Sequence, residues 1–148
     1  MKERELRDPV ADYFLRQGYE CAFERSFPSG YCDVLAFRFA PQTSRRIPEL
    51  LEVIAVELKL DRIAQALSQA RGYAWCGARS FVAMPEDRCR KMKPQTIERF
   101  RKQNIGLLSV NGSVEMLVNA DYWPDGCDLP QQEKLWRIHK RLHATGLA

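Results

Sequence analysis

The chain has 148 residues, 45% of them hydrophobic and 28% charged, which is typical of one globular domain with a single core. No apolar run approaches the roughly 20 residues that span a bilayer, and no apolar segment follows the charged N-terminus MKERELRD. We therefore expect neither a membrane partner nor a secretory signal. Five cysteines without a C-x-x-C pair favour a reducing, cytoplasmic setting, and a net charge of +4 is compatible with a polyanionic partner without requiring one.

The spacing of apolar residues predicts regular elements along most of the chain. In chain order they are a helix over 4–17, strands over 19–27, 31–39 and 53–60, a helix over 62–76, a strand over 79–85, a helix over 93–103, strands over 105–110 and 113–119, and a helix over 131–143. The dipeptide Asn111-Gly112 is a strong hairpin signal between the last two strands. The packing of the last helix is left open. This mixed order predicts an α/β sandwich, a central mixed β-sheet flanked by helices.

The predicted strand VIAVELKL, 53–60, is apolar except for Glu57 and Lys59. Side chains alternate between the two faces of a strand, so these charges point to the same face, about 6.5 Å apart. A buried charge must be paired, bound to a metal or placed at a wet edge of the sheet. Taken alone, this pair is most simply a cross-sheet ion pair or a half-exposed strand end.

A further carboxylate, Asp33, lies in the apolar strand 31–39. By itself it can cap the preceding turn. If strands 31–39 and 52–60 pair, however, Asp33 can lie beside Glu57, and two such carboxylates repel unless a cation lies between them. Mg²⁺ needs only one or two protein carboxylates together with waters and a substrate phosphate. With Lys59 as a fixed positive charge, the set suits hydrolysis of a phosphodiester.

Six short segments, by their order and spacing, resemble the PD-(D/E)XK nuclease superfamily, most closely its small stand-alone phosphodiesterase-like members. The segments are ELRDPV (5–10), QGYE (17–20), CDVLAF (32–37), AVELKL (55–60), QARGY (69–73) and FVAMP (81–85). The resemblance implies a restriction-endonuclease-like three-layer sandwich over residues 1–120. Residues 121–148 form a C-terminal extension that contains a helix.

The resemblance implies that Asp33 and Glu57 are metal ligands and that Lys59 is the lysine of the motif. The implied metal is Mg²⁺, for which Mn²⁺ substitutes. The proline that names the motif is absent before Asp33, where Cys32 stands; many members of the superfamily also lack it. No histidine or asparagine pattern marks Cys32 as a nucleophile, so we expect it to pack in the core.

Three further residues receive roles from the same resemblance. Glu5 corresponds to an acidic residue on the first helix that assists metal or water binding. Gln69 and Tyr73 correspond to a Q-x-x-x-Y pattern that, in many members, lies beside the active site and contacts DNA or orients the site, so Tyr73 is also a candidate contact to nucleic acid. Independently of the resemblance, Gln65, Gln69 and Tyr73 recur every four residues and form one stripe on their predicted helix. A solvated helix face is the alternative for this stripe.

Candidate contacts to nucleic acid come from basic and aromatic residues. In RCRKMK, 88–93, the candidates for phosphate contacts are Arg88, Arg90, Lys91 and Lys93. A run of charges is equally typical of a solvated face. The candidates for base stacking, or alternatively for core packing, are Trp75, Tyr122, Trp123 and Trp136.

Two histidines, His139 and His143, lie four residues apart on the last predicted helix, a spacing that can hold zinc. The glutamate that follows the first histidine in the zinc-protease motif is missing, and no third ligand is evident from the sequence. A surface helix with two histidines is the simpler interpretation.

The sequence therefore predicts a Mg²⁺-dependent endonuclease, a hydrolase of ester bonds, with DNA favoured over RNA as its partner. The alternative is a nucleic-acid-binding or assembly module on the same fold with little catalysis. A third interpretation leaves the Glu57/Lys59 pair structural in an enzyme of unrelated type. Many members of the superfamily are dimers, and the hairpin at Asn111-Gly112 and the last helix are candidate homodimer contacts.

Overall fold

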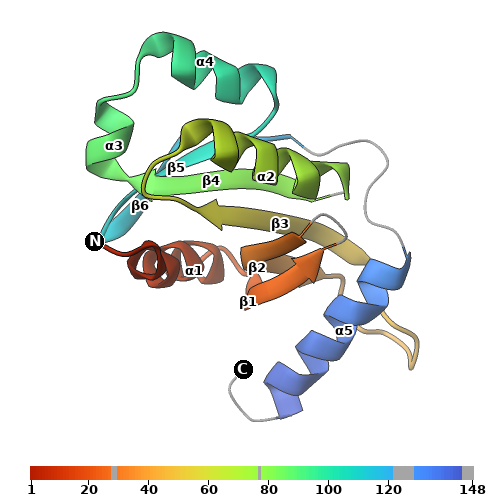
Figure 1. Ribbon diagram of the computed structural model, residues 1–148. Coiled ribbons are helices and arrows are strands. Elements are labelled where there is room, and N and C mark those ends of the chain that lie inside the picture. The colour runs from red at the N-terminus through yellow and green to blue at the C-terminus, as the bar shows by residue number, and fades with distance from the viewer. Residues whose placement is uncertain (28–29, 77, 122–128, 145–148) are drawn as a thin grey trace.

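The computed structural model describes residues 1–27, 30–76, 78–121 and 129–144 (Figure 1). The helices are η1 (Glu3–Leu6), a short 3-10 helix, then α1 (Arg7–Leu15), α2 (Ile63–Trp75), α3 (Glu86–Arg90), α4 (Pro94–Lys102) and α5 (Leu129–Ala144). The strands are β1 (Glu20–Phe27), β2 (Gly30–Phe39), β3 (Leu50–Leu58), β4 (Arg79–Pro85), β5 (Gly106–Asn111) and β6 (Ser113–Val118). Among the described residues, no helix has the length and apolar character that a membrane span requires.

All six strands form one sheet whose spatial order is the chain order, β1 to β6. Strands β1, β2 and β3 pair antiparallel, as do β5 and β6, whereas β3, β4 and β5 pair parallel. Parallel neighbours need long crossover connections, and α2 and the α3–α4 segment provide them. The predicted α/β architecture, a mixed central sheet flanked by helices, is confirmed.

Alternating side chains of β3 separate the two faces of the sheet. Ile54 and Val56 belong to the core on the α1 side, which also contains Phe14. Val53 and Ala55 belong to the core on the opposite side, which α2 and α5 cover. Helix α1 therefore packs on one face and α2 on the other, which gives three layers (Figure 1). Glu57 continues the second series and points to the face that α2 covers.

The observed elements differ from the predicted ones at several places. Strand β3 begins at Leu50, three residues earlier than predicted. The helix predicted over 4–17 is divided into η1 and α1, because Pro9 has no N–H to bond the carbonyl four residues earlier. Strand β3 ends at Leu58, so Lys59 lies one residue beyond it. Helix α3 was not predicted, since five residues are too few to show a helical period.

The C-terminal helix α5, whose packing the sequence left open, covers part of the sheet. Leu135 and Ile138 are buried in the same core as Phe37 and Val53. The chain's own sheet therefore buries this apolar face of α5. A homodimer through the β5–β6 hairpin or through the rest of α5 stays a prediction. Residues 122–128 and 145–148 of the predicted extension lie outside the described residues.

Candidate active site

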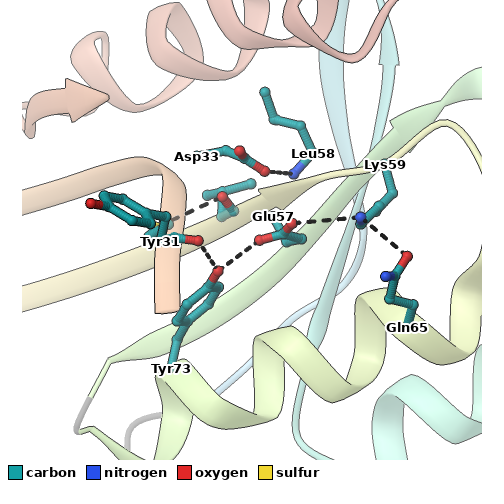
Figure 2. Close-up of polar contacts among 9 residues, drawn as sticks. Tyr31, Asp33, Glu57, Leu58, Lys59, Gln65 and Tyr73 are labelled. Atoms are coloured by element: carbon teal, nitrogen blue, oxygen red, sulfur yellow. Dashed lines mark hydrogen bonds and ion pairs between the residues drawn. The ribbon is translucent and has the colours of Figure 1, made fainter. Parts of the chain in front are cut away.

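The register of β2 and β3 determines where two carboxylates meet. The antiparallel ladder pairs Val34 with Val56, and the next positions along it are Asp33 and Glu57. The Asp33 carboxylate accepts the backbone N–H of Leu58 at 2.9 Å, so a side chain continues the hydrogen bonding of the ladder (Figure 2). Asp33 is thereby held at the end of β3, beside Glu57.

The pKa of Glu57 is unusually high for a carboxyl group. Glu57 is only 4% exposed. Burial, followed by the negative charge of Asp33, raises the pKa of Glu57 to about 7, although the nearby Lys59 ammonium opposes this shift. Glu57 therefore changes its charge near neutral pH, whereas an ordinary glutamate is fully ionised there.

Tyr73 of α2 fixes the orientation of Glu57. Its hydroxyl lies 2.8 Å from Glu57 Oε2 and also contacts the backbone carbonyl oxygen of Tyr31 (Figure 2). Burial, followed by the charge of Glu57, raises the pKa of Tyr73, so this hydroxyl keeps its single proton. When that proton is donated to the Tyr31 carbonyl, the Glu57 carboxyl can bond the tyrosine oxygen only as a protonated donor. The Tyr73 contact thus accommodates both protonation states of Glu57.

Lys59 places its ammonium group on the other side of Glu57. Its backbone N–H bonds the carbonyl of Ala83, which directs the chain just after β3 ends. The side chain is only 13% exposed, so the position is not wet. Nζ lies 3.9 Å from Glu57 Oε1 and donates a 3.4 Å hydrogen bond to Oε1 of Gln65 (Figure 2). The ammonium is thus confined beside the carboxylates.

Helix α2 contributes the predicted stripe of Gln65, Gln69 and Tyr73. Gln65 contacts Lys59, and Tyr73 contacts Glu57, so Gln69 lies between these two contacts on the same helix face. The Oε1 atom of Gln69 is buried and has no hydrogen-bond partner in the described part of the chain. A buried amide oxygen without a donor is costly. This oxygen atom is therefore suited to coordinating a cation.

Two further predicted site residues, Glu5 and Arg88, make contacts of their own outside this cluster. Glu5 is exposed in η1, and its carboxylate accepts the N–H of Lys2 at 3.1 Å. The Arg88 Nε lies 3.0 Å from Asp61, in the connection between β3 and α2. An arginine–carboxylate pair of this kind leaves Arg88 partly neutralised.

The remaining basic residues of the α3 region divide into two groups. Arg90 is paired with Glu86 and Asp87 of its own helix. Lys91 and Lys93 are exposed and form no ion pair with any residue that the structure describes. Of the four predicted phosphate contacts, these two lysines have the most freedom to meet an external anion.

The aromatic candidates and Cys32 differ in how deeply they are buried. Trp136 is buried and packs edge-on against Phe39, so it belongs to the core. Trp75 is 82% exposed at the end of α2 and is no part of the core. Tyr122 and Trp123 lie outside the described residues. Cys32 is buried, and burial raises the pKa of its thiol, which confirms the packing role.

The donor set at the site fits a hard divalent cation. Two carboxylates and an amide oxygen are the ligand types that Mg²⁺ and Mn²⁺ prefer, and a cation would compensate the repulsion between Asp33 and Glu57. Gln69 adds a buried oxygen atom without a donor. Sequence reasoning had named all three residues; the contact of the Tyr31 carbonyl with Tyr73 had no signal in the sequence, because any residue offers a carbonyl.

Comparisons of the chain with family models, with curated proteins and with solved structures found no match. The class of protein is therefore inferred from the residues and the geometry of the site.

We predict that Glu57→Gln stabilises the protein in alkaline buffer relative to wild type. Glu57 has a pKa of about 7 when folded and 4.5 as the ordinary value, so it favours the folded state below pH 4.5, and this contribution is lost as the pH rises through 7. Glutamine keeps the shape of the protonated acid at every pH. In metal-free buffer, the Tm of the variant minus that of wild type should increase between pH 5 and pH 8.

The matched control is Glu115→Gln, an exposed glutamate on β6. Its Tm difference from wild type should stay nearly constant over the same pH range. A difference for Glu57→Gln that is equally flat would show that the carboxyl has an ordinary pKa.

Proposed function

We propose that this protein is a metal-dependent nuclease of the restriction-endonuclease-like class, acting on DNA. The observation that carries the proposal is the buried Glu57 beside the half-buried Asp33, with the Lys59 ammonium 3.9 Å from Glu57. A purely structural ion pair needs one carboxylate for one lysine. Here a second carboxylate lies on the neighbouring strand and adds to the effect of burial in raising the pKa of the first. This excess of negative charge suits a divalent cation.

The residues that would hold Mg²⁺ are Asp33 and Glu57, with the Gln69 amide oxygen as a third donor. When bound, the cation supplies Lewis-acid activation of the phosphoryl group and of water. Lys59 positions the attacking water and stabilises the negative charge that develops on the phosphoryl oxygens. Because Lys59 is largely buried, its charge acts in a medium less polarisable than water, where such stabilisation is stronger.

Proton and cation compete for Glu57. The carboxyl must be ionised to bind a metal, and burial and Asp33 keep its pKa near 7 without one. Tyr73 donates to the ionised form, so release of the proton leaves Glu57 oriented. Cation binding, and with it activity, is therefore expected to increase from pH 6 to pH 8.

The DNA backbone would approach from the side of α3. The Arg88–Asp61 ion pair joins this helix to the connection that follows Lys59, so the exposed Lys91 and the neighbouring Lys93 lie on segments attached to the site. Lysines without internal partners are suited to phosphate contacts that do not depend on base sequence. The substrate is accordingly proposed to be held through its backbone.

We predict that Lys59→Ala lowers cleavage of plasmid and linear DNA at least about 100-fold, as removal of a group that stabilises transition-state charge does. The measurement is a time course of cleavage in Mg²⁺ or Mn²⁺, with an EDTA control and with RNA as a second substrate. Glu115→Gln should cut like wild type.

Two outcomes would contradict nuclease activity in different ways. Binding of DNA in EDTA with no cleavage in any divalent metal would favour the alternative, a nucleic-acid-binding module on the same fold. Cleavage that Lys59→Ala leaves unchanged would show that another site, or a contaminant, cuts the DNA.

We predict that the double substitution Lys91→Glu, Lys93→Glu weakens DNA binding and makes it less dependent on salt. Each lost phosphate contact should lower the slope of log K against log salt by about 0.9 for duplex DNA. Fluorescence anisotropy with catalytically inactive Lys59→Ala as the background, between 50 and 200 mM salt, measures both quantities. The control is the double substitution Arg137→Glu, Lys140→Glu on α5, which changes the net charge by the same amount at two exposed positions. An equal loss in this control would indicate an effect of net charge alone.

A further inference from the structure

A second group of metal-ligating side chains lies where α5 crosses the first strand of the sheet. His139 Nδ1 is 2.6 Å and His143 Nε2 is 2.8 Å from the Oε1 atom of Glu20. Glu20 is 119 and 123 residues before the two histidines, which is why the sequence offered no third ligand. One ligand atom from each of the three residues falls in a group whose members are all within 4.8 Å of one another.

Packing holds these three side chains in place. Glu20 begins β1 and pairs with Phe37 of β2, whose ring lies in the core under α5. The ring of His139 stacks on Trp136 at 4.6 Å and 12° between the planes, and it meets His143 at 4.0 Å. The histidine spacing of four residues on a helix places both rings on the same face. Glu20 and His139 are therefore held by residues outside the group, and His143 is held beside His139.

From this geometry we propose a binding site for a divalent transition-metal ion, tested with Zn²⁺, formed by Glu20, His139 and His143. Imidazole nitrogens select zinc-like ions, whereas the oxygen donors of the site at Asp33 and Glu57 select Mg²⁺. In a tetrahedral zinc site, ligand atoms lie about 3.3 Å apart, given bonds of about 2.0–2.1 Å. The observed spacings of 2.6 and 2.8 Å are those of direct hydrogen bonds, so small side-chain rotations would admit the ion.

A cleft lies beside the three ligands. A hollow of about 330 Å³ is bordered by all three ligands, by Arg38 and by the segment from Phe39 to Gln42. Three protein ligands with one open position facing solvent are typical of zinc sites that also hold a water or a small anion. The site is accordingly one in which the ion keeps an exchangeable ligand in the cleft.

Metal binding here would connect the C-terminal helix to the first strand. A metal ion that binds only the folded state stabilises that state. Because the ion would be held by residues of both β1 and α5, it would stabilise the packing of α5 against the sheet. The site is independent of the proposed nuclease centre. Glu20 pairs with Phe37, four residues along β2 from Asp33, which is about 13 Å for an extended strand.

The experiment is a Zn²⁺ titration of the full chain, followed by ¹H–¹⁵N NMR of the imidazole nitrogens. The chain has only two histidines, so one substitution, His143→Gln, is enough to assign the two sets of ring signals. One equivalent of Zn²⁺ should shift the Nδ1 resonance of His139 and the Nε2 resonance of His143 to ligated values, and it should raise the Tm. Glu20→Gln should weaken Zn²⁺ binding at least about 10-fold by calorimetry, while Glu24→Gln on the same strand should not.

The proposal would be overturned if Zn²⁺ left both imidazole signals unchanged, even if the ion bound to cysteines elsewhere. This NMR measurement uses the wild-type chain, so it does not depend on whether a variant folds. Equal affinity in Glu20→Gln and wild type would also overturn it. Glu57→Gln should bind Zn²⁺ with the affinity of wild type. Failure of the nuclease proposal and failure of the Zn²⁺ proposal can therefore be told apart.

Discussion

Two carboxyl groups, Asp33 and Glu57, meet at the end of the β2–β3 ladder, and their mutual repulsion in a buried setting is the constraint to which the surrounding residues respond. Tyr73 contacts Glu57 from α2, Lys59 approaches Glu57 to 3.9 Å, and the N–H of Leu58 bonds Asp33. These contacts reduce the electrostatic cost without removing it, since the pKa of Glu57 remains raised to about 7. A bound cation would complete the compensation, and the proposed chemistry follows from that need.

The fold was predictable where the spacing of apolar residues in a segment and the length of that segment indicate the same type of element. Apolar alternation located β3 and the faces of its side chains, and Asn111-Gly112 located the β5–β6 hairpin. Prediction was weaker where backbone chemistry or tertiary contacts decide. Pro9 divides the first helix because it lacks a donor, α3 is too short to have a period, and α5 reveals its packing only through core residues such as Leu135 that lie far from their partners in sequence.

The candidate sites differ in how much of each the sequence contains. Asp33, Glu57 and the α2 stripe stand out because charged or polar residues interrupt apolar strands or recur every four positions. The burial of Lys59 was not predicted, because burial at a strand end depends on what the next helix covers. Glu20 shows no local signal at all, since only the fold brings it to His139. Contacts between residues close in sequence can be predicted from the sequence pattern. Contacts between residues far apart in sequence become evident only in the structure.

The most direct measurement is anomalous X-ray scattering from crystals grown with Mn²⁺ near pH 8, where Glu57 is largely ionised. A cation at the end of the β2–β3 ladder should give an anomalous peak between Asp33 and Glu57, roughly 2 Å from a carboxylate oxygen of each. A map without a peak there, in which Glu57 keeps only its contacts with Tyr73 and Lys59, would contradict the idea that these carboxylates exist to hold a metal.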